Sequence, residues 1–158
     1  MESDDNHKVA GFVSKGKRKD LLPVAAGKFL PHRPPMLFVE RLLEREGDRA
    51  VAETTLPTVG IAVCAGKLLP EYFIELIAQT AALANGFDLF CEGQAPNDGM
   101  LVGIDGFTTT DIARPGRLVR VETDKTFSFG PINVISGTIW DGELQLACGV
   151  IKVWENVD

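Results

Sequence analysis

The strongest pattern along the chain is a long, nearly continuous apolar helix signal over residues 70–90. Pro70 suits the first turn of a helix, where its missing N–H costs nothing, and Glu71 complements the positive end of the helix dipole. The sequence EYFIELIAQTAALANGFDLF follows, and Gly93 and Pro96 then mark a break. We therefore predict one helix of about 18 residues here.

Strand-like segments flank this helix on both sides. Residues 49–56 alternate apolar and polar positions, and a Gly-Asp turn separates them from residues 36–46, which favours a hairpin of two strands. After the helix, four segments rich in β-branched and aromatic residues are separated by turn sequences, at 100–110, 118–129, 132–140 and 143–154.

The helix is apolar on nearly every side, and this has an architectural consequence. A helix without a polar face must be covered all round, so we expect the strands to wrap it as a curved antiparallel sheet. This is an α+β fold of one domain over residues 21–158. Residues 57–70 are expected to form a loop, and residues 21–35 a short helical or turn-like stretch that ends in a proline-rich elbow. Residues 1–20 are polar and are expected to form a flexible tail.

Composition narrows the class of protein. The 158 residues carry a net charge of −6, which argues against a nucleic-acid surface. No uninterrupted apolar run reaches the roughly 20 residues that cross a bilayer, and residues 1–10 lack the apolar core of a secretory signal. Cys64, Cys91 and Cys148 show neither a disulfide framework nor zinc-ligand spacing. We therefore expect a cytoplasmic globular protein that needs no metal or cofactor and binds neither nucleic acid nor membrane.

Glu75 is the residue of the predicted helix that could carry chemistry. Between Tyr72 and Ala84 the other polar side chains are the tyrosine hydroxyl, Gln79 and Thr80, and Gln79 lies four residues after Glu75 on one stripe. Carboxylates carried into a low-dielectric interior often serve as general acids or bases. From the pattern alone, two alternatives stay open: Glu75 faces solvent or an arginine at an edge, and Gln79 simply binds backbone groups.

Three segments together resemble the 3-hydroxyacyl-carrier-protein dehydratase family. LPHRPPMLFVERLLE at residues 30–44 is similar to its LPHR-x-PFLLVDR signature, and IELIAQTAA at residues 74–82 is similar to its helix motif IEAMAQ. GMLVGIDGFTTTDIARPGRLVRVE at residues 99–122 resembles its later strand–turn–strand segment. The likeness spans about residues 22–155, in the family's order and spacing.

The resemblance implies a hotdog fold and a dimer with an apolar acyl tunnel at its interface. It implies that Glu75 acts with a histidine from a loop of the partner subunit to remove water across Cα–Cβ of a 3-hydroxyacyl thioester. Gln79 would orient this carboxylate. Backbone N–H groups near Tyr72 and Phe73, at the helix start, would bind substrate by polarising the thioester carbonyl.

The family's loop histidine is missing from the position where the resemblance places it. The family has a G-H-F-P segment before its helix, and counting back from the helix glutamate places Gly60 and Ile61 there. Residues 57–69 contain no His, Asp or Glu. Two side chains could substitute: His32 in the elbow, whose counterpart in the family is architectural, and Cys64 in the same loop, which has no partner nearby in sequence.

These features favour an acyl-thioester-binding protein of the dehydratase kind, in fatty-acid, polyketide or polyene biosynthesis. A retained helix glutamate without the loop histidine resembles the divergent dehydratase-like proteins of polyene-type clusters. Three alternatives stay open. The chain could be a non-catalytic or half-catalytic subunit that completes a heteromer with a histidine-bearing paralogue, a hotdog thioesterase in which Glu75 activates water, or a hotdog scaffold for an unrelated ligand.

The expected partners follow from the same resemblance. The substrate would be an acyl carrier protein or CoA thioester, and the assembly a homodimer, a larger oligomer of dimers or the heteromer. A carrier protein is acidic, so its docking needs local positive charge. The cations that we consider for this role are Arg33, Lys67, Arg114, Arg117 and Arg120.

Overall fold

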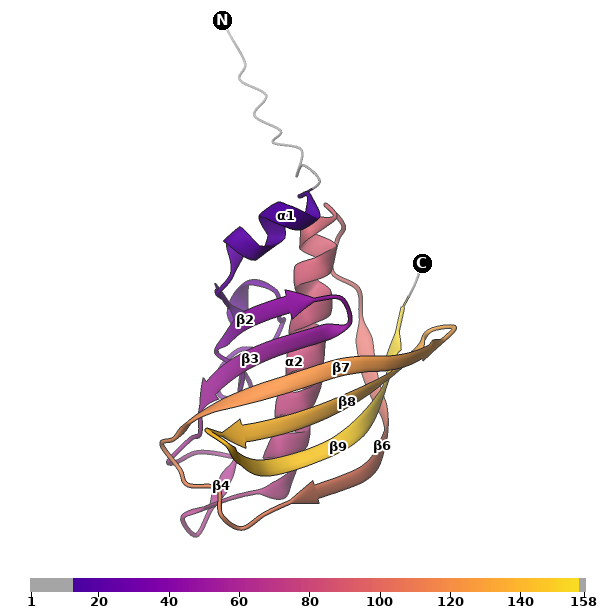
Figure 1. Cartoon of the computed structure of the whole chain (residues 1–158). Helices are drawn as coiled ribbons and strands as arrows, with labels where there is room; N and C mark the ends of the chain where they lie inside the picture. The colour runs from indigo at the N-terminus through magenta and orange to yellow at the C-terminus, as the bar shows by residue number, and fades with distance from the viewer. Residues whose placement is uncertain (1–12, 157–158) are drawn as a thin grey trace, which may run out of the picture.

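Helix α2 (Pro70–Cys91) forms the centre of the molecule (Figure 1). The computed structural model of the chain describes residues 13–156. Pro70 opens α2, and the helix ends where the N–H of Glu92 bonds back to the carbonyl of Asp88 at 3.0 Å. The 22 residues of α2 make it longer than the predicted length of about 18 residues, and it ends at Cys91, just after the predicted segment.

A seven-stranded sheet wraps α2, as Figure 1 shows. Its strands pair in the order β1-β2-β3-β7-β8-β9-β6, and each neighbouring pair is antiparallel. The strands are β1 (Val24–Ala25), β2 (Arg41–Glu46), β3 (Arg49–Thr55), β6 (Gly99–Thr109), β7 (Leu118–Phe129), β8 (Ile132–Asp141) and β9 (Leu144–Glu155). This arrangement is the hotdog fold, so the predicted curved antiparallel sheet around one long helix is confirmed.

The remaining elements are short. They are α1 (Lys15–Arg18), the 3₁₀ turns η1 (Lys19–Leu21) and η2 (Ala26–Lys28), and a separate hairpin of β4 (Val63–Cys64) and β5 (Lys67–Leu68). The hairpin lies in the segment predicted to be a loop and turns at Ala65 and Gly66, which both have positive φ. Residues 1–12 of the predicted tail lie outside the described residues, and α1 occupies part of the rest.

The first long strand begins later than predicted. The pattern suggested a strand over residues 36–46, but β2 begins only at Arg41. The backbone N–H groups of Phe38 and Val39 bond to the Gln79 side chain at 2.9 and 3.4 Å instead of to a neighbouring strand. Residues 36–39 are therefore bonded to the helix through Gln79, whereas the N–H of Glu40 already bonds to Glu53 O of β3 at 3.2 Å.

The helix seats closely against the sheet at Gly137 of β8. A Cβ atom added to Gly137 would overlap the side chain of Ile77, which is fully buried on α2. Leu76, Leu83 and Phe87 are also fully buried, so α2 contributes large apolar side chains along its whole length. Burial of such side chains is the main favourable term in the folding of a domain of this size.

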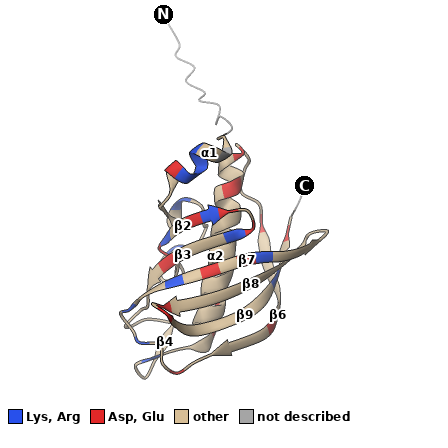
Figure 2. Cartoon of the chain, viewed as in Figure 1, with Lys and Arg blue, Asp and Glu red and all other residues tan. Residues whose placement is uncertain are grey.

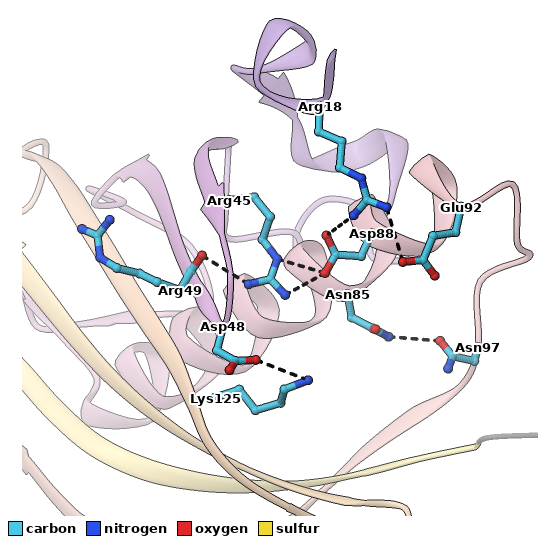
Figure 3. A network of polar contacts seen from close by, with 9 residues as sticks. All are labelled: Arg18, Arg45, Asp48, Arg49, Asn85, Asp88, Glu92, Asn97 and Lys125. Atoms are coloured by element: carbon cyan, nitrogen blue, oxygen red, sulfur yellow. Dashed lines mark hydrogen bonds and ion pairs between the residues drawn. The ribbon is translucent and has the colours of Figure 1, made fainter. Parts of the chain in front are cut away.

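Asp88, near the end of α2, joins three elements through its carboxylate (Figure 3). Arg45 of β2 donates to Asp88 Oδ2 from Nη2 at 2.7 Å and from Nε at 3.0 Å. Arg18 of α1 lies 3.7 Å from Asp88 Oδ1 and donates to Glu92 at 3.4 Å. The charged end of the helix thereby ties α1 and β2 to the core.

Charged residues are spread unevenly over the face that Figure 2 shows. They lie on α1, β2, β3 and β7, whereas β8 and β9 are charged only at Asp141, Lys152 and Glu155. No helix among residues 13–156 is long and apolar enough to cross a membrane.

Replacing Asp88 with Asn should lower the free energy of unfolding by about 1–2 kcal/mol, because two arginines lose a charged acceptor. Glu46→Gln is the matched control. It breaks the Lys19–Glu46 ion pair, whose side chains are 67% and 77% exposed, and should change stability by less than about 0.5 kcal/mol. Urea denaturation measures both. If both substitutions lowered the free energy of unfolding equally, the contacts of Asp88 with Arg18 and Arg45 would not stabilise the fold as proposed.

Candidate functional site

Gln79 connects α2 to the proline-rich elbow, and its amide is fully hydrogen-bonded. Its Oε1 accepts from Phe38 N at 2.9 Å and from Val39 N at 3.4 Å. Its Nε2 donates to Met36 O at 2.7 Å and to Glu75 Oε1 at 2.9 Å. The backbone contacts identify which end of the amide is oxygen, because only oxygen can accept from two N–H groups. Gln79 thus binds backbone groups and also holds a carboxylate.

Glu75 is fixed through one of its two carboxylate oxygens. Oε1 accepts the hydrogen bond of Gln79 and lies 3.6 Å from His32 Nε2. Oε2 has no hydrogen-bond partner or ion pair within the described part of the chain. The side chains of Glu75 and His32 are each 32% exposed. The carboxylate is therefore oriented by protein on one side and open on the other.

The elbow places His32 opposite the helix. Arg33 braces it by donating from Nη1 to the carbonyls of Leu30 at 2.8 Å and His32 at 2.6 Å. The N–H of Met36 closes the turn by bonding to Arg33 O at 2.9 Å. His32 Nδ1 is buried and has no hydrogen-bond partner among residues 13–156. The ring therefore faces Glu75 with one nitrogen and is not bonded through the other.

Glu75, Gln79 and His32 line a cavity of about 530 Å³. Beyond them its floor on α2 consists of small residues, among them Ala78, Ala82 and Gly86. Leu89 lines it fourteen positions after Glu75, so the helical rise gives it a length of about 21 Å. A space of this size and length fits an extended acyl chain.

The far end of the cavity is polar. Asn85 donates to Asn97 Oδ1 at 3.1 Å (Figure 3), and Asn97 donates to Asn156 O at 3.1 Å. Glu155 also lines this end. Burial raises the pKa of its carboxyl, although the charge of Lys125 and a hydrogen bond from Asn133 lower it.

The residues predicted to bind the thioester lie elsewhere. Among the described residues, none of the five predicted positions Tyr72, Phe73, Gly60, Ile61 and Cys64 lines this cavity. Tyr72 and Phe73 are buried in the core, and burial raises the pKa of the Tyr72 hydroxyl. The N–H of Tyr72 already bonds to Leu69 O at 3.1 Å, so it is not free for a substrate carbonyl.

The loop over residues 57–69, which lacks the histidine, has exposed apolar side chains. Ile61 is 53% exposed, and Val59 beside it is 78% exposed. Gly60 between them adopts a φ of 104°, which favours glycine. Cys64 is exposed on β4. The loop therefore exposes apolar side chains, and it does not reach Glu75 of the same chain.

Two of the candidate docking cations are neutralised within the chain. Arg117 makes a bidentate pair with Asp141, at 2.7 Å from Nη2, and this pair lowers the pKa of the Asp141 carboxyl. Arg120 pairs with Glu122 at 2.9 Å. Within residues 13–156, Lys67 makes no ion pair, which leaves it a more available cation for a partner.

Sequence reasoning missed the small-residue floor and the polar far end of the cavity. The signal for the floor was present, because Ala78 and Ala82 recur at the spacing of one helix face. The polar end brings together Asn85, Asn97 and Glu155 from α2, the segment before β6 and β9. Nothing local in the sequence links these three residues.

The chain is similar to known dehydratases over most of its length. A family model described as "ApeP-like: ApeP dehydratase" matches residues 24–158. The chain is 30% identical over 106 residues to a 3-hydroxyacyl-[acyl-carrier-protein] dehydratase FabZ of Bacillus pumilus, covering 65% of this chain and 74% of that protein. It is 33% identical over 132 residues to the FabZ of Syntrophomonas wolfei, covering 77% and 86%.

A solved structure is similar as well. The chain aligns with the dehydratase heterocomplex ApeI:P from Xenorhabdus doucetiae with a TM-score of 0.77 and 18% sequence identity. The alignment covers 85% of this chain and 93% of that one. At this identity the likeness supports the fold.

Gln79→Leu should lower the free energy of unfolding by about 2–4 kcal/mol, because it leaves the N–H groups of Phe38 and Val39 and the carbonyl of Met36 without a partner. Gln145→Leu on β9 is the matched control. Gln145 is exposed, and its replacement should change stability by less than about 0.5 kcal/mol. Chemical denaturation of both variants measures the difference. A Gln79→Leu protein as stable as the control would show that the hydrogen bonds of Gln79 do not stabilise the fold.

Proposed function

Because the chain belongs to the ApeP-like dehydratase family, we propose that it binds 3-hydroxyacyl thioesters and takes part in removing water across their Cα–Cβ bond. The observation that carries this proposal is the carboxylate of Glu75. One of its oxygens is fixed by Gln79 at 2.9 Å, and its other oxygen is open beside a cavity of about 530 Å³. A fixed, partly desolvated carboxylate beside an acyl-sized space is suited to proton transfer at carbon.

In this function Glu75 acts as the base. The thioester carbonyl makes the Cα hydrogen acidic, and the open oxygen of Glu75 removes it. The C–H electron pair forms the Cα=Cβ double bond while the Cβ–O bond breaks, and the hydroxyl leaves as water with a proton donated by a general acid. Acid–base chemistry of this kind needs no cofactor or metal. Gln79 would contribute by keeping the carboxylate oriented, which reduces reorganisation during the reaction.

The acyl chain would extend from Glu75 along the small-residue floor of α2. Ala78 and Ala82 leave room for methylene groups, and the apolar part of the floor favours them over water. We propose an acyl carrier protein or CoA thioester as the substrate, in fatty-acid, polyketide or polyene biosynthesis, and a cytoplasmic location.

A second chain is part of the proposal, because β6 is an open sheet edge. Among residues 13–156, β6 pairs only with β9. It exposes Met100, Leu101, Val102 and Ile104. An exposed apolar edge strand favours pairing with another chain. We propose a homodimer or a heteromer through this edge, in which the projecting loop at Val59 and Ile61 contacts the neighbouring subunit.

The second candidate function is a subunit that supplies half of a site. The feature that favours it is the loop over residues 57–69, which contains no His, Asp or Glu. The similar solved structure from Xenorhabdus doucetiae is a dehydratase heterocomplex, which also supports this candidate. In this case Glu75 would work with a histidine of a different chain, or the cavity would only bind the acyl group.

Glu75→Gln should reduce turnover of a 3-hydroxyacyl thioester by about 10²–10⁴-fold, because the amide cannot accept the Cα proton. Glu71→Gln on the exposed first turn of the same helix is the matched control and should leave kcat/KM unchanged. Formation of the enoyl thioester, followed by ultraviolet absorbance, measures both. Full activity of Glu75→Gln would rule out its role as the base.

If the chain is a half-site subunit, it should be inactive alone and active when mixed with a histidine-bearing dehydratase subunit that co-purifies with it. Glu75→Gln should then lower the activity of the complex, which separates a half-catalytic role from simple acyl binding. The same enoyl assay and size-exclusion chromatography test this. Full activity of the isolated chain would argue against the second candidate.

A further inference from the structure

We propose that His32 is the catalytic acid that works with Glu75 within the same chain, so that the elbow takes over the task of the missing loop histidine. This inference rests on the proposed dehydratase function and adds a second reacting group to it. It assigns His32 a chemical role in place of the architectural one that the family resemblance implied.

The first argument is geometric. His32 Nε2 lies 3.6 Å from Glu75 Oε1, slightly beyond a hydrogen bond, and both side chains line the same cavity. A small rotation of either side chain closes this gap, and catalytic contacts in unliganded enzymes are often long. Elimination requires a base at Cα and an acid at the hydroxyl of the adjacent Cβ. Two groups at this separation can reach both atoms of one substrate.

The second argument concerns how the ring is held. His32 Nδ1 is buried without any partner among the described residues, so no hydrogen bond in that part of the chain holds the ring through this nitrogen. Arg33 braces the elbow through the backbone carbonyl of His32 and leaves the ring itself free. A buried, unsatisfied nitrogen in a native site calls for a functional explanation.

The third argument is the exclusion of other lining groups. Lys28 and Arg33 line the cavity, but neither makes an ion pair with Glu75 within the described residues, and the guanidinium of Arg33 is always protonated. Asp98 and Glu155 lie at the end marked by Asn85, ten residues and about 15 Å along the helix from Glu75. Cys64 does not line the cavity. His32 is the lining residue beside Glu75 whose ring nitrogen faces the carboxylate, at 3.6 Å, and can both donate and accept a proton.

The reaction balances with these two groups. The pair begins with His32 protonated on both Nδ1 and Nε2, as the imidazolium cation, and with an ionised Glu75. Glu75 takes the Cα proton, the C–H electrons form the Cα=Cβ bond, and the Cβ–O bond breaks. The Nε2 proton leaves with the hydroxyl as water, so that Glu75 is protonated and His32 is neutral. Transfer of the proton from Glu75 back to His32 across their contact restores the starting state without any other reactant.

The test is His32→Asn in the full-length chain, with His7→Asn as the matched control, because His7 is the other of the two histidines. His32→Asn should lower kcat by about 10²–10⁴-fold with a smaller change in KM, and His7→Asn should change neither. Wild-type kcat/KM should fall at high pH, where the acid is deprotonated, and this limb of the profile should disappear in His32→Asn. If His32 had only a structural role, His32→Asn would lower the rate but keep the fall of kcat/KM at high pH.

A second variant guards against misfolding. His32→Gly enlarges the cavity, and added imidazole should restore activity at least tenfold if the ring supplies a proton, whereas it should not rescue Glu75→Gln. Loss of activity in Glu75→Gln together with unchanged rates and pH profile in His32→Asn would overturn the inference and leave the proposed function standing. Absence of turnover by the isolated wild-type chain would also overturn it, since a complete pair needs no second protein. The mixing experiment would then still test Glu75.

Discussion

The candidate site depends on one buried amide. Gln79 uses its oxygen for the N–H groups of Phe38 and Val39 and its nitrogen for Met36 O and Glu75. Backbone groups that leave a sheet inside a protein must find another partner, and here a helix side chain provides it. The chain can therefore leave the sheet at this point while the N–H groups of Phe38 and Val39 and the carbonyl of Met36 stay hydrogen-bonded.

The same contacts link stability to chemistry. Because the elbow is held against α2, His32 is held against Glu75, and the two sides of the site move as one unit. The carboxylate is positioned on a rigid helix whose apolar residues are locked in the core, which is the kind of support that reactive groups require. At the other end of α2, Asp88 fixes the helix to β2 and α1 with charged contacts. In addition to its apolar packing, the helix is thus anchored by polar contacts on both sides of the cavity.

The sequence was informative where local pattern reflects global structure. A helix that is apolar all round required a surrounding sheet, and turn sequences separated the strands correctly, so the fold could be predicted. The spacing of Glu75 and Gln79 placed them on one stripe. Residues 36–39 alternate as a strand does, but Met36, Phe38 and Val39 bond to a distant glutamine, which periodicity does not encode. The contact between His32 and Glu75 is equally nonlocal, because it depends on how the elbow folds back over α2.

On the floor of the cavity, the residues that limit the length of a bound acyl chain differ from those that position the reacting carboxylate. Ala78 and Ala82 line it with one Cβ atom each, and neither takes part in holding Glu75. Exchange of either alanine for a larger residue would shorten the space for an acyl chain while leaving Glu75 and its hydrogen bond from Gln79 intact. Evolution could therefore adjust which chain lengths are accepted, one helix turn at a time, without rebuilding the reacting groups.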